Sequence, residues 1–215
     1  MRTIGLIAEG HTDQVVLEQL LVGFFGDEVE VHPVQPQDAG PDANGTYAPG
    51  GWTVLFRFLR EGGHREALQF NDLIVIHVDT DCADEVGFDV PQRDDPAGLA
   101  QAVEARLIEI VGVDFYAAHG HRVIFAVAVD EIECWLLPLL FESQKKKAAK
   151  TTGCLEAANH ALSKRGEPRL STGDSKDPKA YERLARRYRR RSTLSRLGPK
   201  NPSLHRFLLH LEETP

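Results

Sequence analysis

The feature that most constrains this chain is its alternation of short apolar runs with segments of helical spacing. Residues 3–8, 72–78 and 122–129 are almost continuously apolar, which is typical of strands buried on both faces of a sheet. Apolar side chains recur at helical spacing over 13–25, 52–65, 96–111 and 130–141, the last interrupted at Pro138. The alternation predicts an α/β fold in which a mostly parallel sheet is covered by helices.

The connections between these elements follow from their turn residues and caps. Thr12 or Asp13 is a natural N-cap for the first helix. A short strand is expected near 29–34. Residues 35–51 are rich in Pro, Gly, Asp and Asn, which predicts an exposed loop.

The composition is that of a globular protein without a membrane segment. Hydrophobic residues make up 42% and charged residues 27% of the 215 residues, close to the globular average. No stretch approaches eighteen consecutive apolar residues, and the N-terminus lacks the charged-then-apolar pattern of a signal peptide. We therefore expect a cytoplasmic protein that does not contact a membrane.

Charge divides the chain into two parts. Residues 145–215 hold 18 Lys and Arg against 7 Asp and Glu, a local charge of +11. From totals of 25 and 32, the first 144 residues therefore hold 7 and 25, a local charge of −18, and the sum is the net −7. The second part shows no convincing strand, only helical segments near 151–165, 177–193 and 203–213. We predict an α/β domain over 1–144 and a basic helical extension over 145–215.

Acidic residues directly follow two of the apolar runs. Glu9 comes after the first run, and Asp79 and Asp81 come after the second. Because the carboxyl ends of parallel strands meet at one edge of a sheet, neighbouring strands would bring these acids to within about 5 Å laterally. Aspartates at i and i+2 of an extended chain can share one hard cation, Mg²⁺ or Mn²⁺. Neighbouring acids would raise the pKa of Glu9, which suits a group that moves a proton.

These residues resemble the two signatures of the TOPRIM domain. The stretch LIAEGHTD over 6–13 is similar to its first motif, and VIHVDTD over 75–81, about 70 residues later, is similar to its second. The resemblance covers roughly residues 3–135. This domain is shared by type IA and type II topoisomerases, bacterial-type primases, recombination-repair proteins and overcoming-lysogenization-defect (OLD) family nucleases. It implies a Rossmann-like sheet and a Mg²⁺-dependent reaction on phosphodiester bonds of DNA or RNA.

The spacing EGxxD over 9–13 looks like that of OLD-type and small standalone bacterial TOPRIM proteins. The resemblance implies metal binding by Asp13 and, after the third apolar run, by Asp130 and Glu133. The OLD-type pattern often has serine where this chain has Asp130. It also uses a late lysine, for which Lys176 is the candidate. Some relatives serve in phage defence beside an ATPase, so an ATPase subunit is a candidate partner.

The resemblance also implies a mechanism, in which two metal ions straddle the scissile phosphate. The ligands would be Asp13, Asp79, Asp81 and Glu133, with Glu9 as a ligand or as the general acid–base. Lys176 would neutralise charge that develops on the phosphoryl oxygens. The chain would then be a nuclease, and nucleic acid its partner.

Three of these residues also have ordinary structural interpretations. Asp13 is placed where a helix cap would be. Asp130 and Glu133 are placed as first-turn acids, which a helix dipole favours.

The most basic stretch of the chain is a candidate nucleic-acid contact. Its members are Arg186, Arg187, Arg189, Arg190 and Arg191, with Tyr188 among them. Binding through such a run would be sensitive to salt and mostly indifferent to sequence. A solvated helix face is the alternative, and one tyrosine is too little to indicate base stacking.

Cysteine and glycine patterns exclude other chemistries. Cys82, Cys134 and Cys154 form no CxxC pair, so we expect three reduced packing residues and no zinc knuckle. The P-loop pattern GxxxxGK[ST] is absent, so any ATP dependence would come from a partner.

Other functions remain open beside the nuclease. The chain has no room for the strand-passage domains of a topoisomerase, and it has no zinc-binding template module of a primase, although a primase-like nucleotidyltransferase shares the motifs. A GT-A glycosyltransferase also places DxD after a strand, but it leaves EGxxD and the basic segment unexplained. The non-enzymatic alternative is a TOPRIM subunit that docks nucleic acid or a partner without cutting. The sequence decides neither the oligomeric state nor DNA against RNA.

Overall fold

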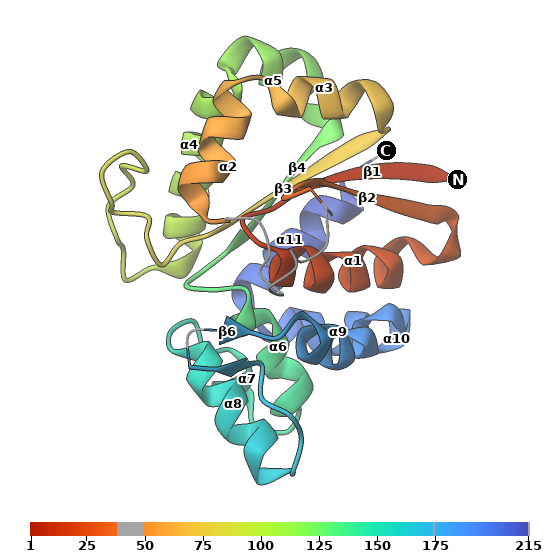
Figure 1. Ribbon diagram of the computed structural model, residues 1–215, viewed down its shortest axis with the longest axis vertical. Coiled ribbons are helices and arrows are strands. Elements are labelled where there is room, and N and C mark those ends of the chain that lie inside the picture. Colours follow the sequence, from red (N-terminus) through yellow and green to blue (C-terminus); the bar gives the residue numbers. More distant parts are fainter. Residues whose placement is uncertain (38–49, 174, 215) are drawn as a thin grey trace, which may run out of the picture.

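The computed structural model describes residues 1–37, 50–173 and 175–214, and it shows a sheet between two layers of helices (Figure 1). The strands are β1 (Arg2–Ile7), β2 (Val29–Gln35), β3 (Leu73–Asp79) and β4 (Val123–Ala128). All are parallel, in the order β2-β1-β3-β4. The predicted α/β class with a parallel sheet is therefore confirmed. Most of the predicted loop over 35–51 lies outside the described residues.

One face of the sheet packs against helices from the middle of the chain. Side chains alternate along each strand, so Ile74, Ile76 and Phe125 share this face. They are buried with α2 (Trp52–Arg60), α3 (Gly63–Phe70), α4 (Pro96–Val111) and α5 (Val113–His119). These four helices form the layer drawn above the sheet in Figure 1.

The opposite face is covered by α1 (His11–Phe25) and α11 (Pro202–Glu212), with α6 (Glu133–Leu140) beside them. Further from the sheet, α9 (Pro178–Ala185) and α10 (Arg191–Leu197) pack on α1, and α7 (Lys145–Ala148) and α8 (Cys154–Lys164) pack on α6 (Figure 1). Short 3₁₀ turns are η1 (Gly26–Glu28), η2 (Gly120–Arg122), η3 (Arg186–Arg189) and η4 (Gly198–Lys200). Tyr181 and Phe207 belong to the same buried cluster as Leu6 and Val75. The boundary near residue 145 stays a prediction, since the two parts share this core.

Helix lengths in the described parts of the chain also bear on membrane association. None of these helices is long and apolar enough to cross a membrane.

The predicted helix over 52–65 is in fact two helices. α2 ends at Arg60 and α3 begins at Gly63. Between them Gly62 has a φ of 90°, a left-handed conformation that ends a helix and that glycine adopts without steric cost.

α6 continues through Pro138, where the sequence indicated an interruption. Proline cannot donate a hydrogen bond to the carbonyl of Cys134, four residues earlier. The side-chain amide of Asn201 donates to that carbonyl instead, at 3.2 Å. A contact from far along the chain therefore satisfies the group that the proline leaves unpaired.

A hairpin lies in the segment for which no strand was expected. β5 (Ser171–Thr172) pairs antiparallel with β6 (Ser175–Lys176). Each strand has two residues, which is too short for an alternation of apolar and polar side chains to be recognised.

The expectation of three reduced cysteines is wrong, because Cys134 and Cys154 form a disulfide. Both are buried, and the bond joins the first turns of α6 and α8. Nothing in their sequence spacing indicates that these two turns pack side by side. Cys82 is the free thiol among the described residues, and burial, with Asp81 nearby, raises its pKa to about 12.

At Gly23 the turn η3 packs directly against α1. A Cβ atom there would lie 1.9 Å from the carbonyl oxygen of Tyr188 in η3. We predict that Gly23→Ala lowers the free energy of unfolding by about 2 kcal/mol, because η3 must move away. Helix propensity alone predicts a gain of roughly 1 kcal/mol. Urea unfolding measures the sign, and a more stable variant would contradict this packing.

Candidate metal centre

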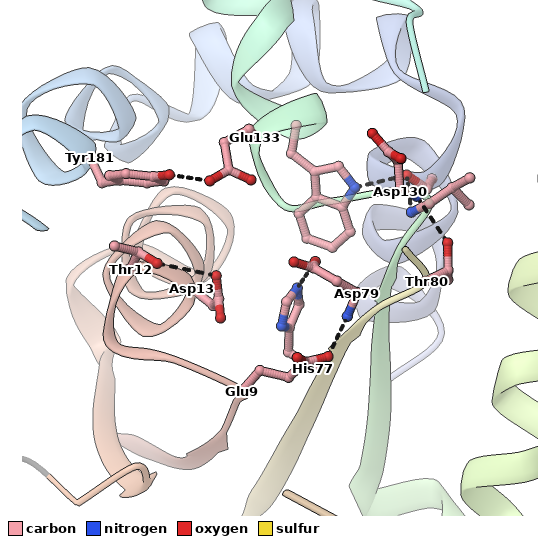
Figure 2. Close-up of polar contacts among 12 residues, drawn as sticks. Glu9, Thr12, Asp13, His77, Asp79, Thr80, Asp130, Glu133 and Tyr181 are labelled. Atoms are coloured by element: carbon pink, nitrogen blue, oxygen red, sulfur yellow. Dashed lines mark hydrogen bonds and ion pairs between the residues drawn. The ribbon is translucent and has the colours of Figure 1, made fainter. Parts of the chain in front are cut away.

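The predicted acids gather where β1, β3 and β4 end. Asp79 is the last residue of β3, and Glu9 lies two residues beyond the end of β1. Glu133 begins α6, shortly after β4. The first turn of α1 adds Asp13. Figure 2 shows these side chains pointing toward a common space.

Glu9 is held by the strand that it faces. Its Oε1 accepts a hydrogen bond of 2.8 Å from the backbone N–H of Asp79 (Figure 2). Burial raises the pKa of Glu9 to about 8, and the nearby charges of Asp13 and Asp81 add to the rise. The expectation that neighbouring acids raise this pKa agrees with the structure, although burial is the larger cause.

Asp79 is buried, and one of its side-chain oxygens lacks a hydrogen-bond partner among the described residues. Nε2 of His77 lies 3.4 Å from Asp79 Oδ1, but the contact does not have hydrogen-bond geometry. It is not an ion pair either, because burial lowers the pKa of His77 to about 3 and the ring is neutral. Among the described residues, Asp79 Oδ1 has no hydrogen-bond partner. Burial, then Asp13 and Glu9, raises the pKa of Asp79.

Glu133 is completely buried and is held at one oxygen only. Its Oε1 accepts a hydrogen bond from the hydroxyl of Tyr181 and forms an ion pair with Nζ of Lys176 at 2.7 Å. Its Oε2 has no hydrogen-bond partner among the described residues. Burial and then Glu133 raise the pKa of Tyr181, so its hydroxyl keeps the proton that it donates.

Lys176 reaches the acids from β6. Burial lowers the pKa of this ammonium, but Glu133 and Asp13 raise it by more, so the charge is retained. The structure thus brings together Lys176 and the predicted acids, although its catalytic role stays a prediction.

Asp13 belongs to both the site and the helix. α1 begins at His11 with Gly10 as N-cap, so neither Thr12 nor Asp13 is the cap that the sequence indicated. Asp13 instead accepts the backbone N–H of Gly10, as an acid at the third helical position does in a capping box. Burial and Glu133 raise its pKa to about 7, and Lys176 opposes the rise.

Asp130 holds the turn that follows β3. Its φ is 69°, and its carbonyl accepts the N–H groups of Thr80 and Asp81, both at 3.0 Å. One side-chain oxygen, Oδ2, accepts the N–H of Gly153 at 2.9 Å. These bonds orient the Asp79–Asp81 turn and tie it to α8. Metal binding by Asp130 stays a prediction, with one of its oxygens already occupied.

Asp81 lies at the exposed rim of the site. β3 ends at Asp79, and the chain bends at Thr80 before Asp81. The two aspartates therefore sit in different environments, and not side by side on an extended strand as expected. Asp81 is still close enough to raise the pKa of Glu9.

The arginine run lies at the other end of α1 from the acids. η3 packs on Gly23, ten residues or about 15 Å along the helix from Asp13. Arg187 donates to the carbonyl of Leu139 at the end of α6, and Arg191 donates to the carbonyl of Phe24 at the end of α1. The arginine run thus forms a turn whose side chains bind carbonyls at the ends of two helices, and it is not one continuous helix face. Nucleic-acid binding by its arginines stays a prediction.

The sequence analysis missed three residues at this site. Tyr181 has no motif around it that indicates its position, and His77 was given no role although it lies inside the stretch VIHVDTD. Glu131 accepts the N–H of Leu155 at 2.6 Å, and burial followed by Glu133 raises its pKa to about 7. The sequence did indicate Glu131, because this acid lies between the predicted ligands Asp130 and Glu133 and was given no role.

The arrangement suits a hard cation bound through few protein ligands. Asp13, Asp79 and Glu133 are buried carboxylates, and one ammonium, Lys176, balances them. Burying unpaired charge is costly, which the raised pKa values reflect. The two unpartnered oxygens, on Asp79 and Glu133, point to where a cation would offset that cost.

The acids around Asp79 are more widely spaced than another group of potential metal ligands. Among the described residues, ligand atoms come within 4.8 Å of one another at Asp130, Cys134 and Cys154, not among the acids around Asp79. The two sulfurs of that tight group form the disulfide and offer no thiolate. Binding of Mg²⁺ at the wider acid site stays a prediction; this ion would need only one or two carboxylates there, because it keeps several waters.

Comparisons of the chain with protein-family models, with curated proteins and with solved structures found no match.

The raised carboxyl pKa values predict how stability depends on pH. Between about pH 5 and 8 the folded protein keeps protons on Glu9 and Asp13 that the unfolded chain has released. Without metal, the free energy of unfolding should therefore fall as pH rises, by up to about 1.4 kcal/mol per pH unit for each proton. Saturating Mg²⁺ or Mn²⁺ should reverse the fall.

Urea unfolding in chelator at several pH values measures this slope. The control is Glu9→Gln with Asp13→Asn, which removes two of the carboxyl groups with raised pKa values and should make the slope shallower, while Asp79 and Glu131 keep the remainder. A wild-type slope near zero, or an unchanged slope in the variant, would contradict the electrostatic account.

Proposed function

We propose that this protein is a Mg²⁺- or Mn²⁺-dependent nuclease of TOPRIM type, which hydrolyses phosphodiester bonds in DNA or RNA. The observation that carries the proposal is the convergence of Glu9, Asp13, Asp79 and Glu133, with unpartnered oxygens on the last two, at the carboxyl edge of a parallel sheet. That edge is where open α/β sheets bind ligands. The TOPRIM resemblance supplies the substrate class.

Each residue has a role that its surroundings support. Asp79 and Glu133 would hold the metal through their unpartnered oxygens, with Asp13 and Asp81 as further ligands. When bound, the metal would activate water and stabilise charge on the phosphate. Glu9, with a pKa near 8, would take and return a proton close to neutral pH.

Lys176 and Tyr181 complete the site from the C-terminal segment. The Lys176 ammonium stays charged among the carboxylates, which suits it to stabilise a phosphoryl oxygen as negative charge develops. Tyr181 holds Glu133 Oε1 and leaves Oε2 for the cation. An ATPase subunit and a part in phage defence belong to the proposal through the resemblance alone, and a cytoplasmic location belongs to it through the lack of a signal-peptide pattern in the sequence.

The first test of the proposal is Asp79→Asn. It removes a buried carboxylate with an unpartnered oxygen, so Mn²⁺ affinity and cleavage of labelled DNA and RNA should both fall at least about 100-fold. Asp84→Asn, at an exposed position of the loop that follows, is the control and should keep both. Wild-type protein that binds Mn²⁺ and nucleic acid but cleaves neither DNA nor RNA would sink the nuclease proposal and favour a non-catalytic subunit.

A second variant separates catalysis from metal binding. Lys176→Met should slow cleavage by roughly 100- to 1,000-fold, because a positive charge beside the phosphate is lost. Its Mn²⁺ affinity should be unchanged or higher, since a cation leaves the acid cluster. Lys179→Met, at an exposed neighbouring position, is the matched control. Equal cleavage rates in the two variants would refute the role of Lys176.

A further inference from the structure

A groove between α6, α7 and α8 combines an apolar floor with a basic rim. It has a volume of about 450 Å³. Leu140, Phe141, Ala157 and Ala161 line its floor. Lys147, Lys150, Lys164 and Arg165 stand around it, and all four are exposed.

The positive charge at this rim is not neutralised. Residues 145–165 hold six Lys and Arg and one acid, Glu156. None of the salt bridges between described residues involves Lys147, Lys150, Lys164 or Arg165. Arg165 donates to the carbonyl of Leu140, which fixes one wall of the groove and leaves the charge in place.

One end of the groove adjoins the candidate metal centre. Nζ of Lys150 donates to the carbonyl of Gly153 at 3.2 Å, and the N–H of Gly153 donates to Asp130. Lys150 is close enough to lower the pKa of Asp130, although burial raises that pKa overall. From there α8 leads away from the acids for 11 residues, about 16 Å, to Lys164 and Arg165. The basic rim therefore forms a path away from the acids.

The arginine run offers no comparable path. Two of its guanidinium groups, of Arg187 and Arg191, donate to carbonyls at helix ends. Its turn packs at the far end of α1 from Asp13.

We infer that a single strand of nucleic acid follows the α7–α8 groove to the metal centre, with phosphates on the basic rim and bases over the apolar floor. Positively charged grooves that carry aromatic side chains are how proteins bind single strands regardless of sequence, and Phe141 is the aromatic side chain of this floor. This inference deepens the proposed function and rests on it for the identity of the polyanion. It concerns binding alone, so it can be tested without cleavage.

The test is binding of a fluorescently labelled single-stranded oligonucleotide, measured by anisotropy in chelator from about 50 to 200 mM salt. The groove variant is K147Q/K150Q/K164Q, which spares Arg165 because it holds Leu140. The control variant is R186Q/R189Q/R190Q, which removes the same charge and spares Arg187 and Arg191 for the same reason. Circular dichroism and urea unfolding check that both variants fold.

The groove variant should bind at least about tenfold more weakly, with a salt slope smaller by about 2, or roughly 0.7 for each lysine. The control variant should stay closer to the wild type in both affinity and salt slope. The proposed binding in the groove would be overturned if the two variants lost affinity equally or if the control variant lost more. It would also be overturned if the wild-type protein bound no oligonucleotide. A wild type that binds through the groove but cleaves no substrate with metal would sink the nuclease function and leave the groove standing.

Discussion

The cost of burying several carboxylates at one edge of the sheet governs the rest of this structure. β1, β3 and β4 end together, so Glu9, Asp79 and Glu133 cannot avoid one another. The chain lowers the cost with a backbone N–H on Glu9, with Lys176 on Glu133 and with protons retained at raised pKa values. The oxygens left without partners are the part that the protein itself does not satisfy. They are the atoms that the proposed cation would satisfy.

The sequence was most informative where one rule of topology decided the outcome. Parallel strands end at a common edge, so two apolar runs that each precede an acid were enough to predict the meeting of Glu9 and Asp79. Lys176 was reached only through the TOPRIM resemblance. Tyr181 and the Cys134–Cys154 bond were not reached at all. Their positions depend on how segments 20 to 48 residues apart pack together, which local periodicity does not encode.

Asp130 shows why a residue's position in a motif does not define its role. Its left-handed backbone is a conformation that aspartate adopts more readily than most residues. That conformation lets one carbonyl receive both N–H groups of the turn after β3, while the side chain holds the start of α8. These contacts account for an aspartate at this position. Asp130 thus positions Asp79 whether or not it also binds metal.

The opposite charges of the two parts of the chain follow from the same geometry. An acidic centre repels a polyanion, so a substrate of this kind needs positive charge close by but not cancelled by the acids. At physiological ionic strength the Debye length is about 8 Å, half the length of α8. The positive charge of Lys150, next to Asp130, is therefore partly offset by the acids. Lys164 and Arg165 lie at the far end of α8, where their charges would still attract phosphate. The distance along α8 lets one small protein hold both charges.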